Sequence, residues 1–393
     1  MPEIPAVIAH LPQRTAELGA LLIEWANINS GSGHLAGLDR MRAALRAGFA
    51  RIPGATFEEL PCAGTAAALR VSVRPKAPLR ILLSGHFDTV YEINDAFQAC
   101  RWLDAERLNG PGVADMKGGL VTMLAALEAF EQTPHAQAIG WDALLTPDEE
   151  VGSHGSRYLF NEAPSRTHFG LVFEPARPNG DIVHSRKGTG GVVVTCHGRA
   201  AHAAKVPNDG RNAILALAEF LLAANKIPAE VPSTMVNVGN IKGGTSATNV
   251  VPDLARSEID LRLTKVADRE ALTSRLDALA AEINRRDGLK LELAYRFNRA
   301  PKECSPTEEK LFPEWQRAAR DVGLAAPNWV HTGGASDGNL LAAAGLSSLD
   351  GLGPIGDGLH SNREFVVVPT LAQRAQVVAL VLHRLASGEI SLT

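Results

Sequence analysis

Four short polar clusters stand out in this chain because each follows an apolar run or lies in a glycine-rich segment. Together they supply two imidazoles and several carboxylates, which suit two zinc ions and leave one carboxylate free to act as a base. A hydrolase is therefore the first hypothesis that these residues support. The clusters are His86-Phe87-Asp88, Asp115, Asp148-Glu149-Glu150 together with Glu174, and His360.

The size and composition of the chain are those of a two-domain globular protein. Its 393 residues are too many for one ordinary core, and 45% hydrophobic with 21% charged residues is a common composition for soluble proteins. A net charge of -4 gives no reason to expect nucleic acid or an anionic membrane as a partner. No apolar run approaches the ~20 residues needed to span a bilayer.

The N-terminus and the cysteines indicate the compartment. Met1-Pro-Glu-Ile-Pro contains an acid and lacks the basic region and long apolar run of a signal peptide. Cys62, Cys100, Cys196 and Cys304 are far apart and form no CxxC, so neither a zinc knuckle nor a disulfide framework is expected. We expect thiols in a reducing compartment, and hence a cytoplasmic protein.

Residues 1–187 alternate between helical and strand patterns. The stretches 80–85, 139–146 and 170–173 are apolar runs of strand length. This alternation predicts an α/β fold with a mixed, mostly parallel sheet covered by helices. Ligands of such sheets bind beyond the carboxyl ends of the strands, which is where the His and acidic clusters occur.

The middle of the chain, residues 188–301, has a different pattern. Its order of strand-helix-strand-strand-helix-strand predicts a ferredoxin-like α+β unit. We expect this unit to be an insertion, because residues 302–393 resume the first pattern and carry His360. A catalytic domain would then comprise residues 1–187 and 302–393. Within the insertion, strands are expected over residues 191–197, 235–241, 255–263 and 289–297, and helices over 212–224 and 268–286.

His86 and Asp88 lie two residues apart just after a predicted strand. In extended backbone both side chains project to the same side. His86 could bind a metal through one ring nitrogen while Asp88 holds the other nitrogen and selects the tautomer. The alternative is an ordinary turn, with Asp88 as a cap.

Asp115 lies in the glycine-rich segment Gly110-Pro-Gly-Val-Ala-Asp-Met-Lys-Gly-Gly. Such a segment lets backbone approach a ligand closely. One carboxylate between two metal ions can neutralise both while holding them ~3.5–4 Å apart. The alternative is a helix N-cap.

Asp148-Glu149-Glu150 places three acids directly after an apolar strand, where they repel one another unless a cation lies among them. Glu150 could bind metal while Glu149 faces the water. Glu174 closes another apolar strand, and carboxylates are seldom buried without a partner. A surface turn is the alternative for each acid alone, but strand ends carrying all of them indicate one site.

His360 follows a run of glycines that begins at Gly351. Alone it would be an exposed loop residue, but a two-metal site needs a second imidazole. His, Asp and Glu ligands without Cys suit Zn²⁺, and Mn²⁺ or Co²⁺ would also fit.

These segments resemble those of the M20 family of metallopeptidases. The family includes glutamate carboxypeptidase, acetylornithine deacetylase, succinyl-diaminopimelate desuccinylase and aminoacylase-1. The matching strings follow family order from residue 84 to residue 360. They are Ser84-Gly-His-Phe-Asp-Thr-Val, Gly110-Pro-Gly-Val-Ala-Asp-Met-Lys-Gly-Gly, Thr146-Pro-Asp-Glu-Glu-Val-Gly-Ser, Gly198-Arg-Ala-Ala-His-Ala, Gly333-Gly-Ala-Ser-Asp-Gly and the segment at His360.

The resemblance implies two zinc ions per subunit in a zinc-peptidase-like domain. His86 and Glu174 would hold one zinc, and Glu150 and His360 would hold the other. Asp115 would bridge the two ions. In this family a cis peptide bond often follows the bridging Asp.

The resemblance also implies roles around the metals. Glu149 would be the general base, and Asp88 would orient His86. His202 would donate to the developing oxyanion, in relatives often from the other subunit; the alternative is a surface loop residue. The inserted domain would be a lid and dimerisation domain, so a homodimer is expected.

A substrate with a free α-carboxylate needs polar or cationic partners. Asn249 matches the family's substrate-binding Asn, Arg299 is a candidate carboxylate clamp, and Gly334 and Ala335 could supply backbone donors. Glu174, where many relatives have Asp, favours the glutamate carboxypeptidase and deacylase side of the family. Ser185-Arg-Lys-Gly departs from the spacing of the side-chain-binding Lys of glutamate carboxypeptidases, so a preference for glutamate stays open.

Three hypotheses follow. The first is a di-zinc hydrolase that releases a C-terminal amino acid from an N-acyl amino acid or short peptide. The second is a biosynthetic deacylase of acetylornithine or succinyl-diaminopimelate type. The third is a non-catalytic binding protein on the same scaffold, which would have lost a ligand or the base, whereas every such position is filled here. An aminopeptidase would need an acidic pocket for a free amine, which the sequence does not indicate.

Overall fold

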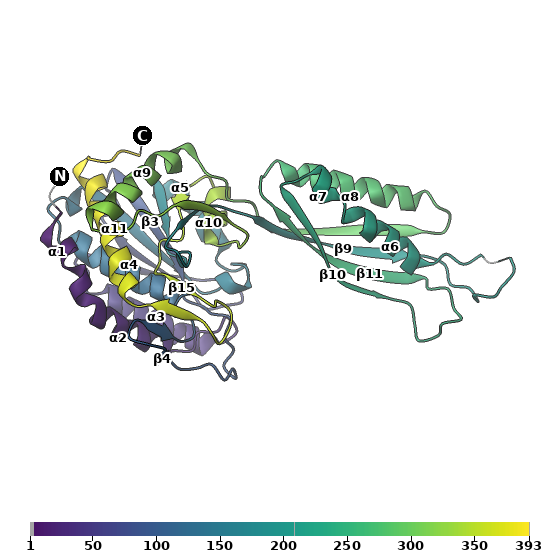
Figure 1. The fold of residues 1–393 in the computed structure, drawn as a ribbon, viewed down its shortest axis with the longest axis horizontal. Coiled ribbons are helices and arrows are strands. Elements are labelled where there is room, and N and C mark those ends of the chain that lie inside the picture. Colours follow the sequence, from purple (N-terminus) through teal and green to yellow (C-terminus); the bar gives the residue numbers. More distant parts are fainter. Residues whose placement is uncertain (1–3, 208, 393) are drawn as a thin grey trace. The chain divides into compact units, whose positions relative to one another are not determined.

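The computed structural model describes residues 4–207 and 209–392 and divides the chain into two compact units, both visible in Figure 1. Each unit has a hydrophobic core of its own. Unit 1 comprises residues 1–185, 304–332 and 336–393, and unit 2 comprises residues 186–303 and 333–335.

Unit 1 is built on a six-stranded sheet with the strand order β1-β2-β6-β3-β7-β14. Strands β6, β3, β7 and β14 run parallel, whereas β2 pairs antiparallel with β6 and β1 pairs antiparallel with β2. The predicted mixed, mostly parallel sheet is therefore confirmed. The strands are β1 (Thr56–Leu60), β2 (Ala68–Val73), β3 (Leu79–His86), β6 (Ile139–Thr146), β7 (Phe169–Val172) and β14 (Ser348–Leu349).

Successive side chains of a strand point to opposite faces of the sheet. Helices cover both of these faces. Leu83 and Ala143 pack in one core with α2, α4 and α11, while Leu82 and Leu144 pack in a second core with α5 and α10. No helix among the described residues is long and apolar enough to cross a bilayer. The helices of unit 1 are α1 (Ala6–Ala9), α2 (Thr15–Ala26), α3 (Leu35–Phe49), α4 (Lys117–Glu131), α5 (Arg157–Arg166), α9 (Pro306–Asp321), α10 (Asp337–Ala343) and α11 (Pro369–Ser387), with 3₁₀ turns η1 (Leu11–Arg14), η2 (Ala136–Ala138) and η3 (Glu149–Val151).

A small antiparallel sheet, β15-β16-β5-β4, joins two loops of unit 1 that are far apart in the sequence. In it Phe365 pairs with Asn109, so the segment after β15 lies beside the loop after β5. These are the loops that carry His360 and Asp115. The remaining strands are β4 (Arg101–Trp102), β5 (Arg107–Asn109), β15 (Gly356–Asp357) and β16 (Phe365–Val367), and a separate pair β8 (Ile182–Arg186) and β13 (Trp329–Thr332).

Unit 2 has one antiparallel sheet, β10-β11-β9-β12, with α6 and α8 on one face (Figure 1). The chain order is strand-helix-strand-strand-helix-strand, apart from the short helix α7, and confirms the ferredoxin-like prediction. Val192 and Val194 on β9 pack against Leu217 and Phe220 on α6 in its core. The elements are β9 (Gly188–His197), α6 (Ala213–Ala224), α7 (Ile227–Glu230), β10 (Thr234–Gly243), β11 (Leu254–Leu263), α8 (Asp268–Asn284) and β12 (Lys290–Arg299).

Candidate active site

Three neighbouring parallel strands end at the same edge of the unit 1 sheet. His86 is the last residue of β3 and pairs with Thr146, the last residue of β6. Strand β7 ends at Val172, two residues before Glu174. Since ligands bind at the carboxyl ends of parallel strands, this edge is where a site is expected.

Two loops complete this edge. Asp115 lies just before α4, and the peptide bond from Asp115 to Met116 is cis, as the resemblance implies. His360 lies between β15 and β16 and has a positive φ of 58°, which is uncommon for a residue other than glycine. The site therefore combines strand ends with two loops from distant parts of the sequence.

Asp115 lies at the centre of the cluster, between the two imidazoles. Its Oδ1 is 3.2 Å from Nε2 of His86, and its Oδ2 is 3.2 Å from Nε2 of His360. Glu150 Oε2 is 3.1 Å from Nε2 of His360, and Glu174 Oε1 is 3.8 Å from Nε2 of His86. Each imidazole thus lies near Asp115 and near one further acid, so the five predicted metal ligands converge.

Asp88 connects His86 to the acidic turn that follows β6. Its Oδ1 and its main-chain oxygen each lie 3.2 Å from Nδ1 of His86, which leaves Nε2 directed at the cluster. The same carboxylate accepts hydrogen bonds from the backbone N–H groups of Glu149 and Glu150 and from the hydroxyl of Ser32. Asp88 is fully buried, so these donors supply the polar partners that a buried carboxylate needs.

The charges of the cluster shift one another. Burial would lower the pKa of His86, but hydrogen bonds to Asp115 and Asp88 outweigh it and raise that pKa well above its ordinary value. Hydrogen bonds to Asp115 and Glu150 raise the pKa of His360 to about 11. Burial would raise the pKa of Asp115, but the two imidazoles hold it well below its usual range. Burial and the charge of Asp115 raise the pKa of Glu150. This cluster strongly favours bound positive charge.

The donor set fits a divalent metal ion. Among the described residues, His86, Asp115 and Glu150 each offer one ligand atom, and these atoms lie within 4.8 Å of one another. Imidazole and carboxylate ligands without thiolate are those of zinc, manganese or cobalt sites. Nδ1 of His86 is engaged by Asp88, which is the usual arrangement of a metal-ligating imidazole.

Glu364 and Lys117 are charged residues at the site that the sequence reasoning missed. Glu364 is fully buried, and its carboxylate accepts hydrogen bonds from the backbone N–H groups of Ala114 and Asp115. Burial raises the pKa of Glu364 to about 7. Lys117 is also buried, which lowers its pKa to about 7, and its Nζ donates to the carbonyl of Ile28. In the sequence, each is only a charged residue close to a predicted metal ligand. Charged residues occur at such positions on ordinary protein surfaces as well.

Ser336-Asp-Gly, the second half of the matching string that begins at Gly333, was given no role from the sequence. In the structure Ser336 caps α10 and donates to Asp350. Asp337 accepts hydrogen bonds from the hydroxyls of Thr146 and Ser153, which flank the acidic turn. This string therefore holds the turn that carries Glu149 and Glu150.

The remaining predicted residues belong to unit 2. His202 and Asn249 lie on neighbouring segments, because His202 forms a bridge with Val250 and Ala203 N–H donates to the Asn249 carbonyl. Both His202 and Asn249 are exposed. Their roles in chemistry or recognition stay predictions.

Three other predicted binding residues also belong to unit 2. Arg299 is buried at the end of β12, opposite Thr189 on β9. The carbonyl of Gly334 accepts a hydrogen bond from Arg186, and Ala335 follows it in the same short segment. Contact with substrate stays a prediction for Arg299, Gly334 and Ala335.

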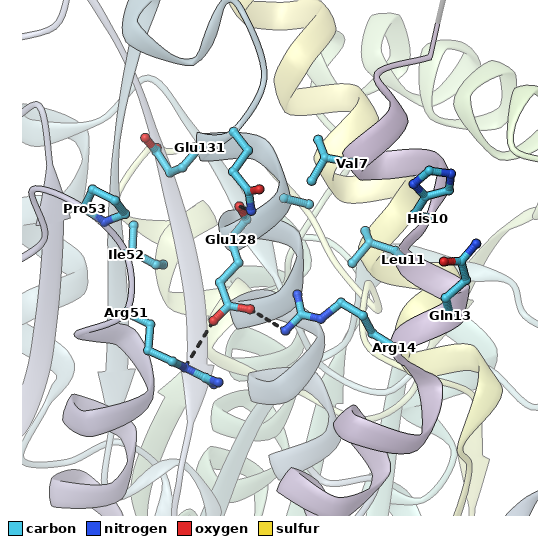
Figure 2. Close-up of a pocket in the computed structure, with 12 residues that line it drawn as sticks. Val7, His10, Leu11, Gln13, Arg14, Arg51, Ile52, Pro53, Glu128 and Glu131 are labelled. Atoms are coloured by element: carbon cyan, nitrogen blue, oxygen red, sulfur yellow. Dashed lines mark hydrogen bonds and ion pairs between the residues drawn. The ribbon is translucent and has the colours of Figure 1, made fainter.

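A cavity of about 780 Å³ lies elsewhere in unit 1, among α1, η1 and the ends of α3 and α4 (Figure 2). Its acid Glu128 is paired with Arg14 at 2.7 Å and with Arg51 at 3.2 Å, as the dashed lines in Figure 2 show. None of the predicted site residues lines it. Glu128 in this cavity therefore has two cationic partners.

Comparison with known proteins identifies the class. A model of peptidase family M20/M25/M40 matches residues 82–384. The chain is 25% identical over 369 residues to carboxypeptidase G2 of Pseudomonas sp. (strain RS-16), covering 92% of this chain and 88% of that protein. It is 31% identical over 297 residues to succinyl-diaminopimelate desuccinylase of Halorhodospira halophila (strain DSM 244 / SL1), covering 72% and 76%. The crystal structure of aminopeptidase PepT from Bacillus cereus ATCC 10987 has the same fold, with a TM-score of 0.80 at 22% identity, covering 95% of this chain and 99% of that one.

The chain therefore belongs to the M20 family of peptidases, and the predicted resemblance is confirmed. Members of this family are metal-dependent enzymes that hydrolyse peptide or related amide bonds. The convergence of imidazoles and carboxylates around Asp115 is the part of this structure that suits such chemistry.

We predict that a divalent metal stabilises the fold through this cluster. Zn²⁺ at about 100 times its Kd should add about 2.7 kcal/mol to the free energy of unfolding and raise the thermal midpoint. Glu150→Gln should lose most of this increase, because a neutral amide replaces a charged ligand. The measurement is thermal unfolding with and without Zn²⁺ after treatment with a chelator.

The matched control for this experiment is Glu128→Gln. Glu128 lies eleven residues after Lys117 along α4, which corresponds to about 16 Å of helix. This variant should keep the full zinc-induced increase. An equal increase for Glu150→Gln would show that zinc binds elsewhere.

Proposed function

We propose that this protein is a di-zinc hydrolase that cleaves the amide bond of N-acyl amino acids or short peptides and releases a C-terminal amino acid. The observation that carries the proposal is the position of Asp115, whose two oxygens each lie 3.2 Å from a different imidazole. A carboxylate placed in this way is suited to bridge two cations. His86 and Glu174 would hold one zinc, and Glu150 and His360 the other.

Zinc ions bound here would lower the pKa of water and polarise the scissile carbonyl, and Mn²⁺ or Co²⁺ could substitute. The chain supplies the proton transfers. Glu149 is the proposed general base: it takes a proton from the attacking water and gives it to the leaving nitrogen as the C–N bond breaks. Asp88 holds both His86 and the Glu149 backbone, so it would fix the base relative to a metal ligand.

Recognition residues are proposed in unit 2. His202 would donate a hydrogen bond to the developing oxyanion, from the same or the partner subunit. Asn249, on the segment next to His202, would bind the substrate, with Arg299 as a clamp for its carboxylate and Gly334 and Ala335 as backbone donors. The adjacency of the His202 and Asn249 segments supports a shared role.

We predict that Glu149→Ala loses at least ~10²-fold in kcat, the low end of general-base contributions. Zinc affinity should stay close to that of the unaltered protein, since Glu149 is not a proposed ligand. Steady-state kinetics together with competition against a chromogenic chelator would measure both quantities. Glu162→Ala, which removes an exposed acid from α5, is the control and should keep normal turnover. Unchanged turnover in a zinc-loaded Glu149→Ala protein would remove Glu149 from this role.

The substrate class is tested with a release assay. The panel would contain N-acyl amino acids and dipeptides, N-acetylornithine and N-succinyl-diaminopimelate, each with and without chelator. We expect zinc-dependent release of a C-terminal amino acid, which chelation abolishes and Zn²⁺ restores. Hydrolysis that survives complete metal removal would overturn the proposed mechanism.

The panel also separates the alternatives. The 31% identity to succinyl-diaminopimelate desuccinylase supports a biosynthetic deacylase as the second candidate, and preference for the last two substrates would establish it. Binding without any turnover would favour a non-catalytic protein on this scaffold.

We propose that the protein forms a homodimer through unit 2. Strand β10 is an edge strand of the sheet, so one side of its backbone is unpaired, and Ile241 on it is 51% exposed. On the adjacent helix α6, Leu215 and Leu222 are 62% and 70% exposed. Seven residues apart, these two leucines lie on one helix face. Apolar side chains next to the open side of an edge strand suit association with a second copy.

Leu222→Asp should therefore shift the protein toward monomer, because a charge would be buried in the interface. Sedimentation velocity at several protein concentrations would measure this shift. The control is Leu35→Asp on α3, which replaces a leucine of 52% exposure in unit 1 and should leave the assembly unchanged. A monomeric unaltered protein would contradict the proposal.

We also propose a cytoplasmic location. Cys62, Cys100 and Cys196 carry free thiols in the structure, and Cys62 and Cys196 are buried. Free thiols are common in proteins of reducing compartments.

A further inference from the structure

The carboxylate of Glu364 has an unusual number of donors. Its Oε1 accepts the backbone N–H groups of Ala114 and Asp115, both at 2.9 Å. Its Oε2 accepts the N–H of Gly112 at 3.1 Å and the hydroxyl of Tyr91 at 2.6 Å. Glu364 is fully buried, so its four partners all come from the protein.

These partners belong to the segments that carry the predicted metal ligands. Gly112, Ala114 and Asp115 form the loop of the bridging carboxylate. Tyr91 follows the segment of His86 and Asp88. Glu364 itself lies four residues after His360. One carboxylate thus joins three ligand segments that are separated by up to about 270 positions in the chain.

The segment of His360 needs such an anchor. The His360 side chain is 55% exposed and its backbone adopts a positive φ of 58°, so neither packing nor backbone preference holds the imidazole in place. The segment is closed by the N–H of Glu364, which donates to the Ser361 carbonyl. The side-chain amide of Asn109 donates to the carbonyls of Asn362 and Glu364.

We propose that Glu364 is a positioning residue that sets the distance between Asp115 and His360 and thereby the metal affinity of the site. The proposal rests on the proposed di-metal function. Glu364 does not contact the metal or the substrate in this role. It acts through the backbone of Asp115 and through the segment of His360.

The chemistry of the donors explains why a glutamate is needed at this position. Three N–H groups and one O–H converge on two oxygens, and an ionised carboxylate offers about four acceptor sites. Glutamine offers one oxygen, and its NH₂ group would face donors instead of acceptors. Tyr91 can also accept, but its single proton serves either Glu364 at 2.6 Å or the Ser361 carbonyl at 2.9 Å. A change at Glu364 therefore loosens both ligand loops together.

The test is Glu364→Gln in the full chain, with zinc affinity measured by competition with a chromogenic chelator. We expect the zinc Kd to rise by about 10–100-fold, the usual effect of losing an outer partner of a metal site. At saturating zinc, kcat should fall while KM changes little, because the substrate-binding residues are untouched. Tyr91→Phe removes one of the four donors and should raise the Kd by a smaller factor.

Asp142→Asn is the matched control. Asp142 is a buried carboxylate of β6 that accepts from Ser72, Arg80 and Arg166, and none of these partners is a predicted ligand. This variant should lower the thermal midpoint and leave the zinc Kd unchanged. A residue with only a structural role would behave like Asp142.

Hydrogen exchange in metal-free protein separates the positioning role from the function on which it rests. Glu364→Gln should speed exchange in the peptides that span residues 110–117 and 358–364. Normal exchange and normal zinc affinity in Glu364→Gln would overturn the proposal. If Glu364→Gln fails to fold, an unchanged zinc Kd in Tyr91→Phe would overturn it instead. Failure of the unaltered protein to bind zinc would overturn the proposed function, while faster exchange would still establish Glu364 as the anchor of both loops.

Discussion

Buried negative charge at one edge of a sheet is the constraint on which this structure depends. Asp115, Glu150 and Glu174 are enclosed near the ends of β6, β3 and β7, where low polarity makes unpaired carboxylates costly. The two imidazoles are the nearest cationic groups, and both have raised pKa values for this reason. The fold concentrates acids that nearby positive charge stabilises, and this arrangement suits a metal site.

Two further carboxylates hold the loops of the predicted ligands at this edge through hydrogen bonds. Asp88 accepts the backbone N–H groups of Glu149 and Glu150, and Glu364 accepts those around Asp115. In both cases a buried acid is paired with backbone donors of a ligand-bearing loop, so no cationic side chain is needed. The loops are thus fixed by their main chain, and the side chains of the predicted ligands do not have to serve as anchors.

The sequence allowed much of the frame to be predicted, because apolar runs of strand length mark buried parallel strands. Residues 139–146 form β6 over the same range, and the acids expected after it do meet His86 across the strand ends. Strand β2, Ala68–Val73, was missed because Arg70 and Ser72 interrupt its apolar pattern; Asp142 and Glu58 partner these residues in the fold. Gly119 on α4 lies so close to another segment that a methyl group there would overlap the carbonyl oxygen of Phe173. Contacts of this kind depend on segments distant in sequence, which no local pattern reveals.

The same distinction explains why the reaction class is easier to predict than the substrate. The proposed metal ligands lie at strand ends and on loops held by Asp88 and Glu364, so their geometry follows from the frame of unit 1. The proposed recognition residues His202 and Asn249 are exposed on loops of unit 2, where substitution disturbs no core. Relatives named for different activities can therefore share 25–31% identity with this chain. On the proposed assignment, substrate choice would depend on loop side chains of unit 2, whereas the hydrolytic chemistry would depend on the sheet edge of unit 1.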